Sequence, residues 1–501
     1  MFCLAAGGEI DSISANPMKK SLLLFLVSLM ASATAFAADA PAPAAVPTAP
    51  ASATTATGTA TAPGADQAGG GGGGRRGGAG GGGRRGGAAA APIDPNAPPP
   101  PREWIDPDTG HRIIRISDEP GSDSLYFHYN PFTPQGDKMV FSTPTGLTSV
   151  DLTTLGNGTP KLDKLVEGAV SLNAASWTTR EVYFSSGGSF YSVNFDTHAV
   201  TKVYDGRVNV INNDGTIIVN AIAATDPTGK TPAPPHRDPI DQHIRMFGDK
   251  IAAGIPLTPD EEYAAAKENG LAGRAVNPSS MAFVFTNVKT GQSVTTGYQY
   301  GSLNHEQFSP TDPTMLLYCH EGTWHEVDRI WTIHTDGSGM TLQHPRTMDM
   351  EIAGHEFWSY DGKTVWFDLQ TPRSKEFWIA GKNIETGKEI RYHVDRDAWG
   401  VHYNVSRDNT MFSSDGGDPT QVAFAQNGEW INLFRVQPDG TLSREKLVNM
   451  SKHNYVTGLG GLEPNAFISP DKKWVIFRSN MFGPDHVFAV EVAKAADSAK
   501  K

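Results

Sequence analysis

The stretch at residues 356–368 reads EFWSYDGKTVWFD. Strand-like residues lead into a turn of the Ser-x-Asp-Gly type, and an apolar alternating run follows the turn. Asp and Gly stand at the positions that a tight turn requires, so the stretch is typical of two antiparallel strands joined by that turn.

The same signature occurs seven times along the chain. The copies are NPFTPQGDKMVFS (130–142), ASWTTREVYFSS (175–186), VINNDGTIIVN (210–220), EQFSPTDPTMLLYC (306–319), EFWSYDGKTVWFD (356–368), YNVSRDNTMFSS (403–414) and AFISPDKKWVIFRS (466–479). Most copies are followed by another strand and turn, which gives four short strands a unit at spacings of about 35–60 residues. This pattern predicts an all-β fold, a seven-bladed β-propeller over residues 102–496. A strand at residues 111–116 is expected to complete the last blade and close the ring, which removes exposed sheet edges.

One interval between copies is too long for a bare blade. The insertion covers residues of about 222–280 and contains TPDEEYAAAKENG, where Thr258 caps a short helix, Pro259 opens it and Asn269-Gly270 ends it. Long insertions in a compact repeat tend to lie over one face. We therefore expect this one to form a partial lid.

The residues before the propeller have a different composition. Met18-Lys19-Lys20 precedes SLLLFLVSLMASATAFA, which predicts a secretory signal peptide within residues 1–37, with Met18 as initiator and a periplasmic protein as the product. The apolar run is too short for a membrane anchor, so we expect no transmembrane segment after cleavage. Residues 38–101 are rich in Ala, Pro and Gly and are expected to form a disordered linker, and residues 497–501 a tail.

Charge and cysteine content argue against a nucleic-acid-binding domain and against a disulfide-bonded one. The whole chain of 501 residues has a formal net charge of −12, and residues 102–501 carry −13, from 36 Lys and Arg against 49 Asp and Glu. A nucleic-acid-binding domain is expected to be basic, so that class is disfavoured. Cys319 is the one cysteine after the predicted signal peptide, so no intrachain disulfide is expected. The oligomeric state is left open.

Polar side chains recur at one position of the repeat. Four residues before the Ser that begins the turn stand His305, His355, His402 and Asn465, and Glu463 lies two positions before Asn465 on the same strand face. Since the innermost strand of each blade lines the central channel, equal offsets place these side chains at one height. A single His there would simply bond a neighbouring blade, but three in register have no packing explanation. Such a convergence is typical of a divalent-ion site.

A longer stretch resembles a known family. LNHEQFSP…LLYCHEGTWHEVDRIWTIHTDGSGM…HPR…GHEFWSYDGKTVWFD, with its blocks CHEG, VD-x-x-W followed by TDG, and GHEFW, resembles the oligogalacturonate lyases, polysaccharide lyases on a TolB-like seven-bladed propeller. The resemblance implies manganese-dependent β-elimination on short pectin fragments, releasing unsaturated uronate. It also implies that His305 abstracts the proton and that His355 binds the metal.

The chain departs from the family pattern at two places. The family's other metal ligands come from a Gln-x-x-His-Pro-His segment, where this chain has GGLEPN (460–465), so Glu463 and Asn465 replace two His. The expected metal ligands are therefore His355, His402, Glu463 and Asn465. The family's catalytic Arg aligns with Ala282, and Arg274 or Arg237 in the insertion is the expected replacement.

Two further residues are expected at the substrate site, with alternatives left open. Trp324 offers a surface for stacking against a sugar, although Trp in propellers is more often in the core. His320 follows the strand that ends at Cys319 and either supports the site or satisfies a hydrogen bond at the blade edge.

The sequence thus predicts a lyase-like enzyme that cleaves oligogalacturonate or a related oligouronide by metal-assisted β-elimination, with Mn²⁺ as cofactor. The main rival is a non-catalytic periplasmic propeller, a TolB-like binding or scaffold module, which would need no ring of His. The propeller of a prolyl-oligopeptidase-like peptidase is disfavoured because the chain contains no G-x-S-x-G.

Overall fold

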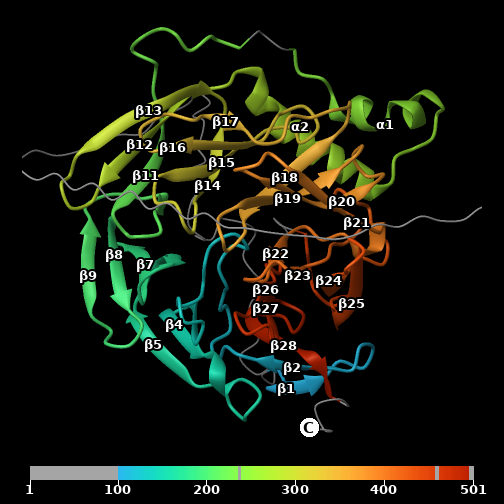
Figure 1. The fold of residues 1–501 in the computed structure, drawn as a ribbon. Helices are drawn as coiled ribbons and strands as arrows, with labels where there is room; N and C mark the ends of the chain where they lie inside the picture. Colours follow the sequence, from blue (N-terminus) through green and yellow to red (C-terminus); the bar gives the residue numbers. More distant parts are fainter. Residues whose placement is uncertain (1–99, 235–237, 457–461, 496–501) are drawn as a thin grey trace, which may run out of the picture. The chain divides into compact units, whose positions relative to one another are not determined.

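The computed structural model describes residues 100–234, 238–456 and 462–495 (Figure 1). The predicted signal peptide, nearly all of the predicted linker and the tail lie outside these residues, as does Arg237. None of the described helices is long and apolar enough to cross a membrane.

The described strands form seven antiparallel sheets arranged as blades around a centre (Figure 1). In chain order, six of the sheets are β3 (Lys138–Thr143), β4 (Gly146–Asp151) and β5 (Leu162–Glu167); β6 (Ser171–Ala175), β7 (Glu181–Ser186), β8 (Ser189–Asn194) and β9 (Val200–Tyr204); β10 (Val210–Ile211), β11 (Ile217–Ala223), β12 (Ser280–Asn287) and β13 (Ser293–Tyr300); β14 (Leu303–Phe308), β15 (Met315–His320), β16 (Ile330–His334) and β17 (Thr341–Leu342); β18 (Ile352–Trp358), β19 (Thr364–Gln370), β20 (Phe377–Asn383) and β21 (Glu389–Val394); and β22 (Tyr403–Val405), β23 (Met411–Ser414), β24 (Trp430–Val436) and β25 (Leu442–Asn449). The predicted seven-bladed propeller is confirmed.

The seventh sheet joins the two ends of the propeller. Its order is β1 (Glu103–Ile105), β2 (His111–Arg115), β28 (His486–Lys494), β27 (Trp474–Ser479) and β26 (Phe467–Ile468). Ile114 of β2 pairs with Ala489 of β28. The predicted closing strand is therefore in place, and backbone hydrogen bonds between distant parts of the chain close the ring.

The blade that contains β3 obtains its innermost segment in another way. The isolated bridges Asp123↔Ser142 and Phe132↔Met139 attach residues 123–132 to β3. This segment includes Tyr126, Phe127 and His128, and it brings three ring-bearing side chains into the centre of the propeller.

The recurring turn has a physical role that explains its sequence. In the three blades of Ser359, Ser406 and Ser469, the Ser hydroxyl donates to the Asp two residues later, at 2.6–2.7 Å. The same hydroxyl accepts the backbone N–H of the residue five positions after it, at 2.9–3.0 Å. Because these Ser side chains are buried, each turn both satisfies its own polar groups and sets the start of the next strand.

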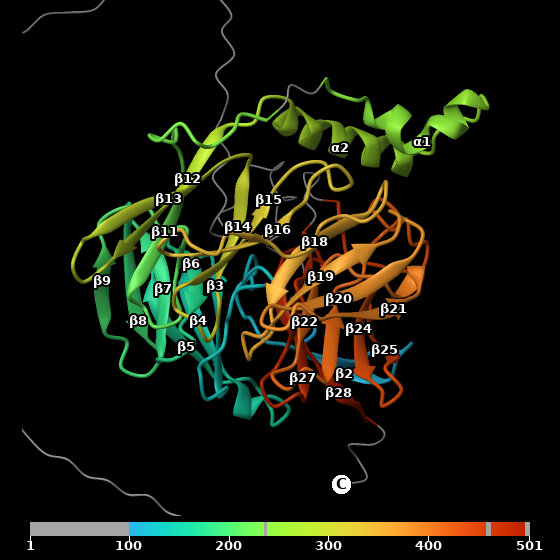
Figure 2. The same cartoon turned by 45° about the horizontal axis from the view of Figure 1, so that its top comes forward.

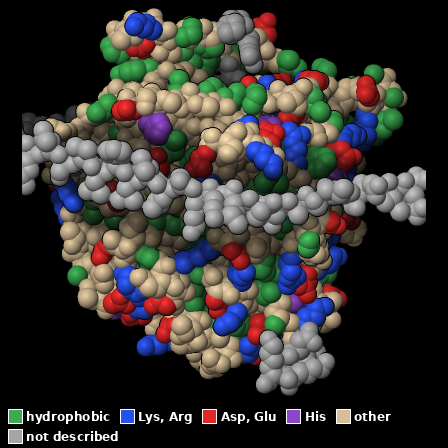
Figure 3. Space-filling model, in the orientation of Figure 1, with side chains coloured by type: hydrophobic (Ala, Val, Ile, Leu, Met, Phe, Trp, Pro, Cys, Tyr) green, Lys and Arg blue, Asp and Glu red, His purple; other side chains and the backbone are tan. Residues whose placement is uncertain are grey.

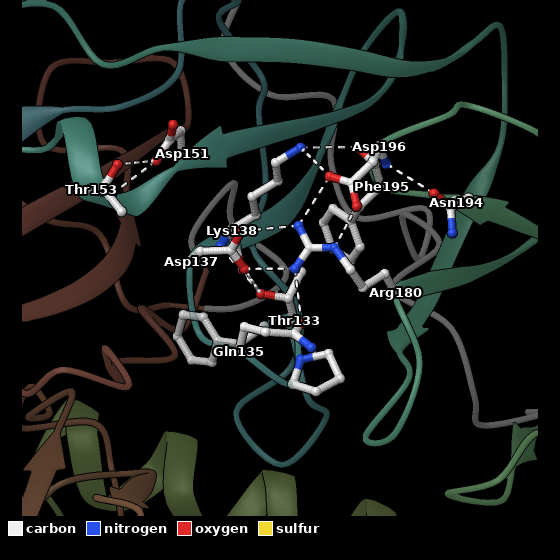
Figure 4. A network of polar contacts seen from close by, with 12 residues as sticks. Thr133, Gln135, Asp137, Lys138, Asp151, Thr153, Arg180, Asn194, Phe195 and Asp196 are labelled. Atoms are coloured by element: carbon white, nitrogen blue, oxygen red, sulfur yellow. Dashed lines mark hydrogen bonds and ion pairs between the residues drawn. The ribbon is translucent and has the colours of Figure 1, made fainter.

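Charged side chains link two neighbouring blades beside the recurring turns (Figure 4). Arg180 donates to Asp137, just before β3, at 2.8 Å, and it also pairs with Asp196, which follows β8. Lys138 reaches the same Asp196 at 2.8 Å. The hydrogen bonds from Arg180 lower the pKa of the Asp137 carboxyl to about 2. On the face drawn in Figure 3, acidic and basic side chains are intermixed, so the net negative charge forms no single patch there.

Two helices lie between β11 and β12, on one side of the ring (Figure 2). They are α1 (Gln242–Ala252), which the sequence did not predict, and α2 (Pro259–Val276). Thr258 caps α2 as expected, and the Glu261 side chain completes a capping box. The predicted end at Asn269-Gly270 is wrong, because α2 continues to Val276 and residues on both sides of Gly270 contact the blades.

Ring closure makes a testable prediction about stability. Ile114 is fully buried, whereas Ile105 on the adjacent β1 is 56% exposed. We expect Ile114→Ala to lower the free energy of unfolding by about 2–5 kcal/mol, because it removes buried methyl groups and leaves a cavity. The matched control Ile105→Ala is expected to change it by less than about 0.5 kcal/mol. Urea unfolding measures both, and equal effects would contradict the closing role of β2.

Candidate functional site

Three residues of the predicted ring share an unusual backbone conformation. His305, His355 and Asn465 have φ values of 56°, 50° and 51°, in the left-handed region that residues other than glycine rarely adopt. The pairing of β14 with β15 is interrupted between Asn304 and Gln307, and that of β18 with β19 between Gly354 and Phe357. The two His therefore stand in equivalent bulges, and such strained positions cluster at functional sites.

The structure brings the His side chains of the predicted ring close together, and Tyr126 lies among them. The ring centroids of His355 and His402 are 4.5 Å apart, and Tyr126 lies 5.0 Å from His402 and 5.6 Å from His305. His128 completes the group at 5.5 Å from His305. Sequence reasoning found His305, His355 and His402 but missed Tyr126 and His128, because these precede their blade's turn copy in an irregular segment.

His305 is held neutral within this group. Its Nδ1 is buried without a hydrogen bond and lies 3.7 Å from Oε1 of Glu356, a fully buried carboxylate. Burial lowers the pKa of His305 below its ordinary value of 6.5, although the Glu356 charge opposes the shift. A neutral imidazole is the form that can accept a proton.

His402 has partners at both ring nitrogens. Nδ1 lies 2.8 Å from Oδ2 of Asp415, and Nε2 lies 3.1 Å from the hydroxyl of Tyr126 and 3.8 Å from Oε2 of Glu463. His402 and Asp415 are both buried. Sequence reasoning missed Asp415, which follows β23 directly and carries no motif that marks it.

The predicted metal ligands do not fit a resident ion as they stand. Asn465 uses both amide atoms within the protein: Oδ1 accepts from the Phe127 N–H at 3.0 Å and Nδ2 donates to the Glu463 carbonyl at 3.0 Å. His402 is engaged on both sides, which leaves His355, with a buried and unpaired Nδ1, and the carboxylate of Glu463. Across the residues described, no three His, Cys, Asp or Glu side chains form a group that could hold a metal ion.

A buried guanidinium lies beside the ring instead. Arg329 is 2% exposed, and its Nη1 donates to the Gly322 carbonyl at 3.2 Å. Its Cζ lies 4.6 Å from the ring centroid of Trp324, which in turn lies 4.6 Å from His355. In residues 100–234, 238–456 and 462–495 no carboxylate oxygen comes within 4.0 Å of this guanidinium. Burial lowers the pKa of Arg329, but Cys319 and the nearby carboxyl groups of Glu356, Glu321 and Glu268 outweigh burial and raise it, so the guanidinium is a charged group beside the ring.

The other predicted substrate residues have different surroundings. Arg274 forms an ion pair with Glu321 and is 41% exposed at its side chain. His320 Nε2 lies 2.5 Å from Oε1 of Gln299, and burial lowers its pKa to about 4, so the blade-edge interpretation of His320 is supported. Trp324 lies at the ring, between His355 and Arg329. Arg237 falls outside the described residues.

The channel is nearly filled on the side of the recurring turns. A cavity of about 40 Å³ there is lined by aromatic and amide side chains, among them Phe127, Tyr129, Phe308 and Asn404. It has room for water but is far smaller than the pockets of about 300 Å³ or more that take ligands. A ligand of sugar size does not fit this cavity, which leaves the opposite face of the channel.

The insertion lies on that opposite face. Each innermost strand runs toward the recurring turn and the next strand returns, so the loops after β11 and β15 lie at the end where His305 stands. Glu268 of α2 pairs with Arg373 at 2.6 Å, and both side chains are 3% exposed. Glu268 also accepts from the backbone N–H of Trp324 at 3.4 Å. The helix thus packs on the loop that carries Trp324.

This buried ion pair makes a prediction about the insertion. Glu268→Ala would leave the Arg373 charge buried without its partner, which costs about 3–5 kcal/mol. We expect α2 to detach and become sensitive to limited proteolysis. The control Glu262→Ala lies on the same helix at an exposed position and is expected to leave proteolysis unchanged. Equal resistance of the Glu268 variant would show that the pair does not hold α2 in place.

Comparisons with known proteins give one consistent family. Residues 275–496 match the family model of the oligogalacturonate lyases. The chain is 26% identical over 223 residues to an oligogalacturonide lyase of Pectobacterium atrosepticum. This alignment covers 42% of this chain and 54% of that protein. It is 26% identical over 239 residues to an oligogalacturonate lyase of Dickeya dadantii, covering 43% and 58%. The match thus spans little more than half the length of these curated relatives.

Solved structures agree on the fold. An oligogalacturonate lyase in complex with manganese matches with a TM-score of 0.58 and 19% identity, over 80% of this chain and 97% of that one. An oligogalacturonate lyase from Vibrio parahaemolyticus matches with a TM-score of 0.57 and 18% identity, over 78% and 96%. At these identities the likeness concerns the fold alone.

Proposed function

Residues 275–496 of this chain belong to the oligogalacturonate lyase family, and on that premise we propose that the protein cleaves a short oligouronide by β-elimination. The observation that carries the proposal is the ring of His305, His355 and His402, two of which are held in left-handed bulges of their innermost strands. A scaffold propeller needs no such convergence of imidazoles. We also propose that the protein acts in the periplasm, as the predicted signal peptide indicates.

The reaction requires a base next to a weakly acidic carbon. Elimination at a 4-linked uronate removes the proton on C5, which is α to the carboxylate, and expels the oxygen on C4. His305 is our choice of base. Its Nδ1 lies 3.7 Å from Oε1 of Glu356 and has no hydrogen-bond partner, so no hydrogen bond through Nδ1 engages the ring. Burial keeps the ring neutral and ready to accept.

The reaction also requires positive charge at the uronate carboxylate, because a second negative charge develops on it as the C5 proton leaves. We assign this role to Arg329. Its planar guanidinium suits bidentate binding of a carboxylate, and it has no ion pair of its own in the described part of the chain. Arg274, which the sequence suggested, is already paired with Glu321.

Removal of the base tests the proposed function. Oligogalacturonate and other oligouronides are expected to yield the ultraviolet absorbance of a conjugated uronate, and His305→Ala to lower kcat by about 10²–10⁴-fold. His393→Ala, at an exposed His on β21, is the matched control and is expected to retain activity.

The same assay addresses the cofactor. The solved manganese complex of a relative supports running the wild type with added Mn²⁺ and with EDTA. Activity that survives EDTA would support the conclusion that the side chains of His402 and Asn465 are engaged within the protein and hold no metal ion. Activity that depends on Mn²⁺ would support the metal site that the sequence predicted. If no uronide yields an unsaturated product, with or without Mn²⁺, the result contradicts the proposed lyase activity and favours a non-catalytic scaffold propeller.

The role of Arg329 has its own test. Wild-type enzyme is expected to prefer the free acid to the methyl ester of the same oligouronide. Arg329→Gln should lower kcat/KM for the acid by about 10–100-fold, because a hydrogen bond to a charged group contributes about 1.5–3 kcal/mol, and should abolish the preference.

Arg274→Gln serves as the comparison variant. If the preference is lost in this variant and kept in Arg329→Gln, the carboxylate is bound by the insertion and the assignment to Arg329 is wrong.

A further inference from the structure

Helix α2 spans the two blades that carry His305 and His355. Glu268, in the middle of the helix, pairs with Arg373 between β19 and β20 and accepts from the Trp324 N–H between β15 and β16. Figure 2 shows α2 over the sheets that contain β14 and β18. A side chain on the inner flank of α2 therefore lies beside the approach to the ring.

The two flanks of α2 face different parts of the protein. Asn269 faces α1, because its Oδ1 accepts from the Gln242 N–H at 2.8 Å. Arg274 points the other way and pairs with Glu321. The Glu321 carboxylate also accepts from the side chain of Asn304, which stands on β14 directly before the proposed base. The flank of Arg274 is therefore the inner flank of the helix.

Lys267 lies on this inner flank. An α-helix turns by about 100° per residue, so the seven residues from Lys267 to Arg274 return to within about 20° of the same direction. Lys267 and Asn269, in contrast, are about 200° apart around the axis. The side chain of Lys267 thus leaves the helix on the side of the ring and not on the side of α1.

The charge of Lys267 is felt at the ring itself. The pKa of His355 is held well below its ordinary value by burial first, and then by the positive charges of His402, His305, Arg329 and Lys267. Arg329 acts on this imidazole from the blades and Lys267 acts on it from the helix. The two cations therefore flank one site.

The Lys267 side chain is exposed and has no ion pair within the described residues. Its own helix supplies no acidic partner, because the positions three and four residues away hold Tyr263, Ala264, Gly270 and Leu271. Arg274 on the same flank is already paired. The ammonium of Lys267 is thus the cation of the inner flank that an anion from solution can reach.

An oligouronide brings more than one negative charge to this site. The surroundings of the ring carry the carboxylates of Glu321, Glu356 and Glu463, and the whole chain has a formal net charge of −12. Such a site repels a polyanion unless cations there meet its carboxylates. Arg329 is assigned to the uronate that loses its C5 proton. In the shortest cleavable substrate, a dimer, the second carboxylate belongs to the sugar across the cleaved bond.

We propose that Lys267 is a specificity-determining residue that pairs with the carboxylate of the uronate across the cleaved bond, the sugar whose anomeric oxygen is expelled from C4. The enzyme then selects two acidic sugars in succession. This inference rests on the proposed function and deepens it by naming the second sugar of the substrate.

The kinetic signature of this contact follows from the charge of its partner. The carboxylate across the bond keeps its charge throughout the elimination, so Lys267 binds the substrate and the transition state equally well. Loss of such a contact raises KM and leaves kcat unchanged. A residue that merely holds the site in shape would lower kcat instead.

The experiment compares two substrates with the full chain, under the metal condition in which the wild type is active. The first is digalacturonate, and the second is the same dimer with a methyl ester on the non-reducing uronate alone. Both release the same unsaturated uronate, which mass spectrometry quantifies. The variants are Lys267→Gln, Lys267→Arg and the control Lys363→Gln, which removes the same charge from an exposed position before β19, at the opposite end of its blade.

We expect Lys267→Gln to raise KM for digalacturonate by about 5–10-fold, because a charge-assisted contact at a partly open site is lost, and to leave kcat unchanged. Lys267→Arg keeps the charge and is expected to keep KM within about twofold of the wild type. On the monoester the wild type and Lys267→Gln should have the same KM. Lys363→Gln should match the wild type on both substrates.

The outcomes separate the two claims. An unchanged KM of Lys267→Gln on digalacturonate, an equal rise on both substrates, or a fall in kcat at unchanged KM overturns the role of Lys267 alone. If the wild type forms no unsaturated product from any uronide, the proposed function fails, and calorimetric titration with digalacturonate decides about Lys267 by itself. Weaker binding to Lys267→Gln than to the wild type then supports the contact, and equal binding or none overturns it.

Discussion

The pairing of β2 with β28 is the constraint on which the rest of the structure depends. These strands come from opposite ends of the described chain, and their hydrogen bonds close seven sheets into one ring. Closure fixes the tilt and height of each innermost strand. Only then do equal positions in different blades, such as His305 and His355, meet at one level of the channel.

The chemistry of the centre follows from burial. Imidazoles that face one another in a poorly solvated ring stay neutral, as the pKa of His355, held well below its ordinary value by burial and by His402 and His305, illustrates. The carboxyl group of Asp415 orients the His402 ring through a contact of 2.8 Å at Nδ1. The arrangement suits the transfer of protons between neutral groups, with one buried guanidinium, Arg329, to meet an anion.

Much of this could be predicted from the sequence, because the repeat has a local cause. In three blades the Ser hydroxyl that closes the turn donates to an Asp two residues later, so the turn has a readable pattern and the offset to His355 and His402 can be counted. Family blocks then gave the reaction class. The insertion's helix cap at Thr258 was equally local.

The rest depends on contacts that no local pattern records. Tyr126 reaches the centre through an irregular segment attached by isolated bridges, and Asp415 acts on His402 from the next strand of its blade. The end of α2 was misjudged because Asn269-Gly270 is a local stop signal, whereas packing of α2 on the blades extends the helix. Arg329 was passed over because its burial beneath Trp324 is a property of the fold.

The central claim is that the bond breaks by elimination, and the mass of the product tests it most directly. Incubation of the full chain with a defined trigalacturonate, followed by mass spectrometry, is predicted to give one fragment lighter by one water than the corresponding hydrolysis product. Fragments with the masses of hydrolysis, or intact substrate under all metal conditions, would contradict the account.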